Sequence, residues 1–269
     1  MVAGLRRTYL VYLPENVTPA QRVPLVFVHH GYTMSGQGMF DLTKYAALAD
    51  AEGIALAFPD GQGGPNTSTA PWNVGSGVCP SAFGAPPVAM GDDFAMLDAV
   101  RADIAADQCI DDARVFVTGF SMGGYFAHHA GCERTDIAGI APHSGGTHAL
   151  TGCESTKKPV IIFHGLSDSV IPPGCNDPSA PPVQNVVAAA TAWATHNGCA
   201  LTTTPVSVTN GTCRTYDNCP AGGQVQLCTF PGMGHCWAGG AASAGVNACP
   251  TYADATVLQW QFFKQYAWN

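Results

Sequence analysis

The 269-residue sequence has few charged side chains and lacks the features that mark a nucleic-acid-binding or membrane protein. Charged residues make up only 11% of the chain, the net charge is −8, and lysine and arginine form no cluster. A nucleic-acid-binding protein needs such a cluster to neutralise phosphates, so we expect no nucleic-acid partner. No apolar run reaches the length needed to cross a bilayer, so we expect no membrane partner either.

We expect no signal peptide in the first residues of this sequence, although the cysteine content points to an oxidising compartment. The opening MVAGLRRTYLVYLPE lacks the apolar centre of a signal peptide. Eleven cysteines are unusual for the cytosol, where thiols stay reduced, so we expect a secreted, extracellular protein whose signal peptide has been removed. The cysteine spacings, for example around Cys213 and Cys219, lack the CxxC pairs of a structural zinc site, so we expect no metal.

Strands alternate with helices along the chain, which predicts an α/β fold. Apolar residues make up 46% of the sequence and no Pro- or Ser-rich linker divides it, so we expect one domain over residues 1–269. Hydrophobic periodicity and turn residues predict strands at residues 8–14, 23–31, 54–61, 114–120, 137–145, 158–165 and 224–234, and helices at 39–53, 91–109, 183–198 and 252–266. Such an alternation gives a mostly parallel sheet with helices on both faces, and ligands bind at the carboxyl ends of its strands. Residues 61–91, rich in Gly, Pro, Ser and Asn, are expected to form a functional loop.

The stretch VFVTGFSMGGYFAHHAG runs from a β-branched strand through a glycine-flanked serine into an alanine-rich helix. Ser121 lies at the junction, with Gly119 two residues before it and Gly123 two residues after it. Small residues at these positions let strand and helix approach closely while the serine projects from a strained turn. The helix also directs free N–H groups toward a reacting carbonyl oxygen. An ordinary strand-to-helix turn is the alternative, but the context favours a catalytic nucleophile.

A serine nucleophile needs an orienting acid and a base, each in a loop after a later strand. Asp168 follows the strand at 158–165 and is our candidate acid, while Asp177, further from a strand end, is its competitor. Asp168 could alternatively be a turn residue that bonds its own backbone. Among the nine histidines, His235 follows a late strand in the glycine-flanked segment FPGMGHCW, and we expect it to be the base.

Other histidines are expected to have supporting roles. His128 and His129 lie on the helix after the serine and are expected to be packed or solvated rather than catalytic. His29, His30 and His164 lie at strand ends, where we expect them to shape the floor of the site or its hydrogen bonds.

Several sequence blocks occur in the order found in a known family. They are PLVFVHHG, ADAEGIALAFPDG followed by WNVGSGVC, DQCIDDARVFVTGFSMGGYFAHHAGCE, IAPHSG, FHGLSDSVIP and PGMGHCWAGG. Through these blocks nearly the whole chain resembles the secreted serine esterases of the poly(3-hydroxybutyrate) depolymerase-like and feruloyl/acetyl-xylan esterase group. The resemblance implies an α/β-hydrolase fold, no cofactor and a Ser-Asp-His triad, whose matching positions here are Ser121, Asp168 and His235.

The residues around the expected oxyanion hole depart from the commonest pattern of that group. The group most often carries Asn or Gln after the serine, whereas this chain has Met122, and Tyr32 directly follows the HHG tripeptide. A Tyr/Met pair is similar to that of cutinase-like polyester hydrolases. We expect the backbone N–H groups of Tyr32 and Met122 to bind the oxyanion. Tyr32, Trp72 and Trp237 are candidates for an aromatic wall that binds substrate, although Trp72 and Trp237 could equally be packed aromatics.

Together these features predict a serine esterase that acts through an acyl-enzyme. Its expected substrates are feruloyl or acetyl esters of plant cell-wall polysaccharide, and the alternative substrate is a polyester, either a polyhydroxyalkanoate or an aromatic polyester. A non-catalytic binding protein on a hydrolase fold is a weaker alternative because the triad is intact, and a serine peptidase is weaker because the sequence shows no gating domain. We expect the enzyme to be a monomer.

The cysteines predict a set of disulfides. Cys109 and Cys132 end the helices on either side of the strand before the serine, and we expect them to be bonded. Four more crowd the segment before the expected base and should pair among themselves: Cys199, Cys213, Cys219 and Cys228. Cys236 is expected to bond Cys249 and so steady the base loop, with Cys175 as the second choice. Because the total is odd, at least one cysteine must stay free or pair between chains.

Overall fold

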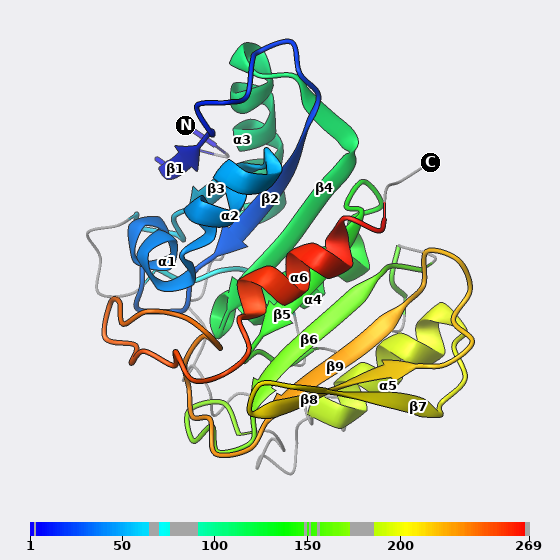
Figure 1. Cartoon of the computed structure of the whole chain (residues 1–269). Coiled ribbons are helices and arrows are strands. Elements are labelled where there is room, and N and C mark those ends of the chain that lie inside the picture. Colours follow the sequence, from blue (N-terminus) through cyan, green and yellow to red (C-terminus); the bar gives the residue numbers. More distant parts are fainter. Residues whose placement is uncertain are drawn as a thin grey trace.

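A nine-stranded, mostly parallel sheet organises the part of the chain that the structure describes (Figure 1). The computed structural model describes residues 1–2, 4–64, 70–75, 91–147, 150, 152–154, 157–172 and 186–266. The strand order is β1-β3-β2-β4-β5-β6-β9-β8-β7. The parallel strands, each predicted from the sequence, are β2 (Val23–His29), β3 (Ala55–Pro59), β4 (Ile110–Phe120), β5 (Gly139–His143), β6 (Val160–Gly165) and β9 (Val225–Phe230). Their carboxyl ends therefore all lie at one edge of the sheet.

Antiparallel strands form both sides of this sheet. β1 (Tyr9–Tyr12), which was also predicted, pairs with β3 on one side. On the other side, a hairpin of β7 (Thr203–Val208) and β8 (Gly211–Tyr216) pairs with β9. This hairpin was not predicted, although the sequence contains a signal for it. Asn210, one of the two residues between the strands, adopts a left-handed conformation (φ 52°), which Asn tolerates better than most residues.

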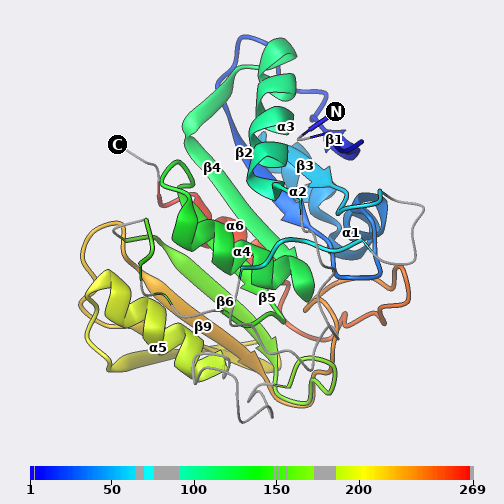
Figure 2. The same ribbon diagram turned by 180° about the vertical axis from the view of Figure 1, so that it is seen from behind.

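Helices cover both faces of the sheet (Figures 1 and 2). One face carries α3 (Asp93–Asp107), α4 (Met122–Glu133) and α5 (Val186–Asn197), and the other carries α1 (Gly36–Thr43), α2 (Tyr45–Glu52) and α6 (Ala255–Phe263). Each helical layer buries its own apolar cluster against the sheet, as expected for a parallel sheet. In the described ranges, no helix combines the length and the apolar character needed to cross a bilayer.

The single helix expected over residues 39–53 is instead two helices. The chain breaks at Lys44, which adopts a left-handed conformation (φ 53°) between α1 and α2. The hydroxyl of Thr256, on α6, donates a hydrogen bond to the carbonyl of Thr43 (2.8 Å), an acceptor that a continuous helix would use internally. Contact with an element far along the chain therefore overrides the local helical pattern.

Four disulfides lie in the described part of the chain: Cys132–Cys153, Cys199–Cys219, Cys213–Cys228 and Cys236–Cys249. The expected pairing among the four crowded cysteines is confirmed, and so is the bond from Cys236 to Cys249. The second choice, Cys175, lies outside the described residues and is not the partner of Cys236.

The expected bond between Cys109 and Cys132 is wrong, because Cys109 is a free thiol and Cys132 pairs with Cys153. Cys109 directly precedes β4, whose 11 residues span about 36 Å at roughly 3.3 Å per residue. Helix α4 has 12 residues and runs back only about 18 Å. The helix therefore ends about halfway along the strand, and Cys132 does not reach Cys109.

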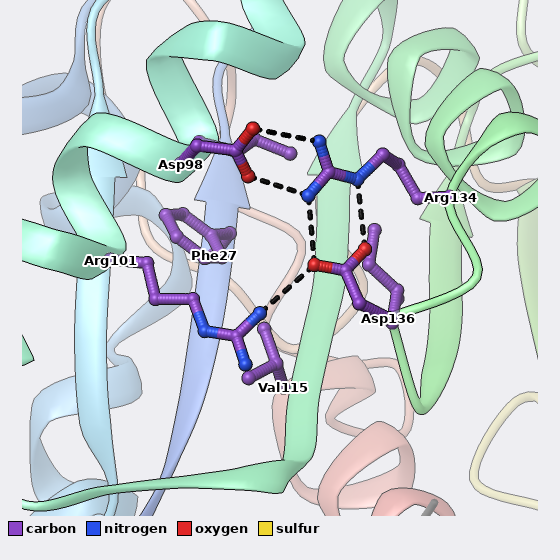
Figure 3. A pocket seen from close by; sticks show the side chains of 8 residues that line it. Phe27, Asp98, Arg101, Val115, Arg134 and Asp136 are labelled. Carbon is purple, nitrogen blue, oxygen red and sulfur yellow. Dashed lines mark hydrogen bonds and ion pairs between the residues drawn. The ribbon is translucent and has the colours of Figure 1, made fainter.

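An ion network lies beyond the carboxyl end of α4 (Figure 3). Arg134, the C-cap of α4, is held between the carboxylates of Asp98 on α3 and Asp136 before β5. Arg101 of α3 donates to Asp136 (2.9 Å) and to Asp112 (2.6 Å). Hydrogen bonds from Arg134 hold the pKa of Asp136 below its usual range. The network ties α3, α4 and the start of β5 together at the end of α4 that is remote from Ser121.

Candidate active site

Ser121 occupies a strained turn between β4 and α4. Its backbone angles (φ 57°, ψ −118°) cost roughly 1–3 kcal/mol in a residue other than glycine. The amide of Ser121 donates to the carbonyl of His143 (2.9 Å), and its own carbonyl accepts from the amides of Gly124 (2.9 Å) and Tyr125 (3.1 Å). These bonds to β5 and to the first turn of α4 hold the serine in its strained conformation.

Gly119 and Gly123 leave room for close contacts between backbones. A Cβ on Gly119 would overlap the carbonyl of Gly123, and a Cβ on Gly123 would overlap the carbonyl oxygens of His29 and His30. Strand β4, helix α4 and the end of β2 therefore meet at one point. The G-x-S-x-G spacing predicted that these glycines would allow strand and helix to approach closely, and the structure shows this close approach.

Asp168 lies in the turn after β6, and both of its carboxylate oxygens are engaged. Oδ1 accepts from the amides of Val170 (2.9 Å) and Ile171 (2.8 Å), and Oδ2 accepts from Nδ1 of His235 (2.7 Å). The side chain is fully buried. Asp168 therefore bonds the backbone of its own turn, as the alternative interpretation predicted, and is also the hydrogen-bond partner of His235. The competitor, Asp177, lies outside the described residues.

His235 lies in the loop after β9, and its ring is held on two sides. A carboxylate only accepts hydrogen bonds, so Nδ1 carries a proton toward Asp168 and Nε2 is the nitrogen available as a base. The ring packs against Phe120, the residue before Ser121, with centroids 4.6 Å apart. The amide of Ser167 donates to the carbonyl of Met233 (2.9 Å), which joins the turn that holds Asp168 to the loop that holds His235.

Ser121 and His235 line one cavity of about 270 Å³. Phe120 and three loops form the rest of its wall. The loops are residues 31–34 after β2, residues 170–171 after Asp168, and residues 244–246 in the loop closed by the disulfide from Cys236. The described wall of this cavity contains no Asp, Glu, Lys or Arg side chain. The structure thus brings the expected nucleophile and base together, with Asp168 behind the base, around a cavity suited to an uncharged group.

The expected oxyanion donors lie beside the serine. Met122 is the first residue of α4, a position where the backbone N–H has no partner within the helix. Tyr32 lines the cavity, and a Cβ on the preceding Gly31 would lie 3.2 Å from the Cβ of Ser121. The loop after β2 therefore passes directly along Ser121, as the expected role requires.

The expected aromatic wall needs a correction, because only Tyr32 of its three members lines the cavity. Trp72 is 1% exposed and donates from Nε1 to the carbonyl of His30 (2.8 Å). Trp237 is 0% exposed, donates to the hydroxyl of Thr256 (3.0 Å) and stacks on the ring of His143. Both indoles find buried partners for their N–H groups, and the packed alternative holds for both.

Two buried histidines contact the loops that hold Asp168 and His235. Burial lowers the pKa of His164. Its Nε2 donates to the carbonyl of Ile171 (2.9 Å), in the turn that holds Asp168. Burial also holds the pKa of His143 well below its ordinary value, and its Nε2 accepts from the amide of Ala238 (3.1 Å), just after His235. His143 was not singled out from the sequence, although it ends a strand as His29 and His164 do. In the described ranges, no three His, Cys, Asp or Glu side chains lie together in a way that could hold a metal ion.

The chain is similar to known esterases over most of its length. Residues 2–150 match the family described as putative esterase. The chain is 30% identical to feruloyl esterase B of Piromyces equi over 243 residues, which cover 85% of this chain and 42% of that protein. It is 27% identical to feruloyl esterase C of Emericella nidulans over 270 residues, which cover 96% and 83%. The chain therefore spans less than half the length of the Piromyces relative.

Solved structures of esterases have the same fold. An acetyl xylan esterase from Aspergillus awamori aligns with a TM-score of 0.62 at 18% identity, covering 86% of this chain and 89% of that chain. A thermostable esterase aligns with a TM-score of 0.62 at 18% identity, covering 98% and 60%. At these identities the similarity shows the fold, and the expected α/β-hydrolase fold is confirmed.

Proposed function

This chain belongs to the putative esterase family, and from that premise we propose that Ser121, His235 and Asp168 catalyse the hydrolysis of a carboxylic ester. The observation that carries the proposal is the 2.7 Å bond from Nδ1 of His235 to buried Asp168, beside a cavity that His235 shares with Ser121. The buried carboxylate fixes the tautomer of the imidazole, so its Nε2 is free of a proton and can act as a base.

In the first step, Oγ of Ser121 attacks the ester carbonyl while Nε2 of His235 takes the hydroxyl proton. Asp168 stabilises the imidazolium that forms. The carbonyl oxygen becomes an oxyanion, for which the N–H groups of Tyr32 and Met122 are the proposed donors. His235 then gives its proton to the departing alcohol oxygen, and the acyl group stays on Ser121.

In the second step, water replaces the alcohol. His235 takes a proton from the water as the water attacks the acyl-enzyme, and the oxyanion forms again in the same place. When the tetrahedral intermediate collapses, Ser121 regains its proton from His235 and the carboxylic acid leaves. The strained turn serves both steps because it keeps Oγ projecting from the end of β4.

The proposed substrates are feruloyl or acetyl esters of plant cell-wall polysaccharide. The relatives named feruloyl esterase and the structural neighbour named acetyl xylan esterase support this class. The cavity wall supports it too, because Tyr32, Val170 and Val246 offer apolar surface and no fixed charge to an acyl group. Secretion, which such a substrate requires, is supported by the four disulfides in the described part of the chain.

A polyester is the second candidate substrate, and exposed apolar side chains beside the cavity favour it. Val170 lines the cavity and is 54% exposed, and Leu166, in the same turn, is 46% exposed. Apolar surface at the mouth of an active site suits adsorption to a water-insoluble polymer. Residues 65–69 and 76–90, in the loop that would build or block an open groove, lie outside the described residues.

Turnover of p-nitrophenyl acetate by the wild type and by Ser121→Ala tests the proposed activity. We expect the wild type to release p-nitrophenol and the variant to release none above the buffer rate. A folded wild type without activity on any short ester would reject the proposal in favour of a binding protein. A panel of methyl ferulate, acetylated xylan and polyester film then separates the substrates: release from ferulate or xylan supports the first class, and release from film supports the second.

A further inference from the structure

His30 precedes the loop that carries Tyr32, and its buried ring makes two hydrogen bonds to backbone groups. Nε2 accepts from the amide of Gly61 (2.9 Å), and Nδ1 lies 2.7 Å from the carbonyl oxygen of Gly31. A carbonyl oxygen only accepts, so Nδ1 must carry the proton. The neutral ring with its proton on Nδ1 is the one tautomer that satisfies both contacts.

The bond to Gly31 acts on the peptide group between Gly31 and Tyr32. In a trans peptide, the C=O of Gly31 and the N–H of Tyr32 lie in one plane and point in opposite directions. A donor that holds the carbonyl oxygen therefore also sets the direction of the Tyr32 N–H. The amide of Met34 donates to the same oxygen (3.0 Å), so His30 supplies one of two anchors for this peptide.

The neighbouring peptides of this loop are held in the same way. Nε1 of Trp72 donates to the carbonyl of His30 (2.8 Å), and the amide of Ala70 donates to the carbonyl of Tyr32 (2.9 Å). Burial lowers the pKa of His30 to about 4, which keeps its ring neutral and the tautomer unchanged over the working range of most esterases. Three successive carbonyls thus have fixed donors, and the loop is oriented before any substrate binds.

We propose that His30 is a positioning residue of the oxyanion hole: its Nδ1–H holds the Gly31–Tyr32 peptide so that the Tyr32 N–H is aimed at the adduct on Ser121. The inference rests on the proposed function, because it assumes that such an adduct forms. Preorganised donors are worth more than donors that must turn toward the charge as it develops. Loosening this peptide should therefore slow the chemical step and leave substrate binding largely unchanged.

Two substitutions separate the two bonds of His30. The amide nitrogen of Asn lies close to the place of Nδ1, so His30→Asn keeps a donor for Gly31 and loses the partner of Gly61. The side-chain amide of Gln reaches the place of Nε2, and its oxygen can accept from the amide of Gly61. His30→Gln therefore keeps the bond to Gly61 and loses the donor for Gly31. His29→Gln is the matched control. Nδ1 of buried His29 donates to the carbonyl of Thr118 (3.2 Å), and among the described residues its ring makes no hydrogen bond to residues 31–34.

For p-nitrophenyl acetate, we expect His30→Gln to lower kcat by about 10- to 100-fold with KM within about 3-fold, less than the roughly 100- to 1,000-fold cost of losing an oxyanion donor outright. His30→Asn and His29→Gln should keep kcat within about 3-fold of the wild type, which is about 0.7 kcal/mol in activation free energy. The unfolding temperature of each variant, measured in parallel, separates this pattern from a loss of stability.

Binding of phenylboronic acid gives a readout that does not depend on turnover. The boron adds to Oγ of Ser121 and becomes a tetrahedral anion, while the hydroxyl proton passes to His235. The inhibition constant should rise in His30→Gln by about the factor by which kcat falls, and should change little in His30→Asn, because the anion mimics the transition state.

Equal losses of kcat in the Asn and Gln variants, or wild-type kcat in His30→Gln, would overturn this role for His30. Nitrogen-15 NMR of the wild type tests it without any variant: the proton of His30 should be on Nδ1, and a proton on Nε2 would overturn the inference. These results leave the proposed function intact. A wild type without Ser121-dependent ester hydrolysis would overturn the proposed function itself, and the inference with it.

Discussion

The two ends of helix α4 differ in the number of charged side chains around them. At the amino end, Ser121 lies in a strained turn beside a cavity whose described wall contains no Asp, Glu, Lys or Arg side chain. At the carboxyl end, Arg134 lies between Asp98 and Asp136 in a network of paired charges (Figure 3). The same helix therefore presents a strained, sparsely charged site at one end and a compensated ionic cluster at the other.

This difference separates function from stability. The paired charges favour the folded state, although partial exposure limits each pair to about 0.2–1 kcal/mol. The strained backbone of Ser121 opposes folding, and we infer that it persists because the proposed catalysis needs its geometry. Substitutions at the amino end should therefore change kcat, and substitutions at the carboxyl end should change the free energy of unfolding.

The largest expected effect is that of Ser121→Ala at the amino end. The hydroxyl acts only in the chemistry, so kcat should fall on the order of a million-fold, the loss seen when a triad serine is removed. Thermal unfolding should stay close to that of the wild type, because the variant keeps the backbone bonds of the turn. A variant that is folded and retains more than a trace of wild-type kcat would remove Ser121 as the nucleophile.

Asp168→Asn should have the next largest effect, lowering kcat by about 10,000-fold. The side-chain oxygen of the new Asn can still accept from the backbone N–H groups of Val170 and Ile171. Its NH2 group cannot accept a hydrogen bond from His235. The wrong tautomer of His235 then faces Ser121. Asp136→Asn is the matched control: the same chemical change beyond the other end of α4 should keep kcat and lower stability. Comparable losses of kcat in both variants would show that the two ends of α4 do not differ in their effect on catalysis.

Removing the disulfide with Cys236→Ser and Cys249→Ser should affect rate and stability together. The bond closes a loop with a sequence separation of 13, worth about 3 kcal/mol in the chain-entropy model. The loop begins beside His235 and supplies residues 244–246 of the cavity wall, so kcat should also fall.

The matched control removes the Cys199–Cys219 disulfide, whose sequence separation of 20 is similar and whose residues do not line the cavity. This variant should lose comparable stability, measured by urea unfolding, and keep its kcat. If both double variants keep wild-type kcat, the Cys236 disulfide does not hold the base in place.

Arg134→Met should have the smallest effect, and only on stability. It leaves Asp98 and Asp136 without their shared partner. We expect this to lower the free energy of unfolding by about 1–2 kcal/mol, because a partly exposed network is worth little more than its separate pairs. The value of kcat should not change, because Arg134 lies at the far end of α4 from Ser121. A marked loss of kcat would show that the two ends of the helix are coupled.

The pH dependence of the stability difference between the wild type and Arg134→Met gives a second test of the ion network around Arg134. The pKa of Asp136 is lower in the folded protein than its usual value, so its contribution is present above the unfolded pKa of about 4 and is lost as pH falls through the folded pKa. The stability gap between the wild type and Arg134→Met should therefore be full near pH 6 and shrink below about pH 4. A gap of unchanged size in strong acid would mean that these ion pairs are not its source.

The sequence predicted the amino end of α4 better than the remaining structure. A nucleophile, an acid and a base that each follow a strand are local patterns, and parallel topology alone brings strand ends to one edge. For that reason Ser121, Asp168 and His235 could be named from spacing, and the structure places them around one cavity or directly behind it.

The failures come from contacts between distant segments. Trp72 and Trp237 are buried by partners on other elements, and the bond from Thr256 breaks the helix at Lys44. The Cys109–Cys132 error came from equating a helix with a strand of similar residue count but twice the length. The bonds of His30 to Gly31 and Gly61 could not be foreseen either, because they depend on how two loops meet.

Covalent labelling of Ser121 is the most direct test of the central claim, that this serine is activated by His235 and Asp168. A p-nitrophenyl phosphonate ester phosphonylates an activated serine with release of p-nitrophenolate, and mass spectrometry of the intact chain counts the adducts. We expect one adduct per chain, mapped to the peptide that contains Ser121, none in Ser121→Ala, and much slower labelling in Asp168→Asn. Ester hydrolysis by a chain that is labelled elsewhere, or labelled equally in Ser121→Ala, would contradict it.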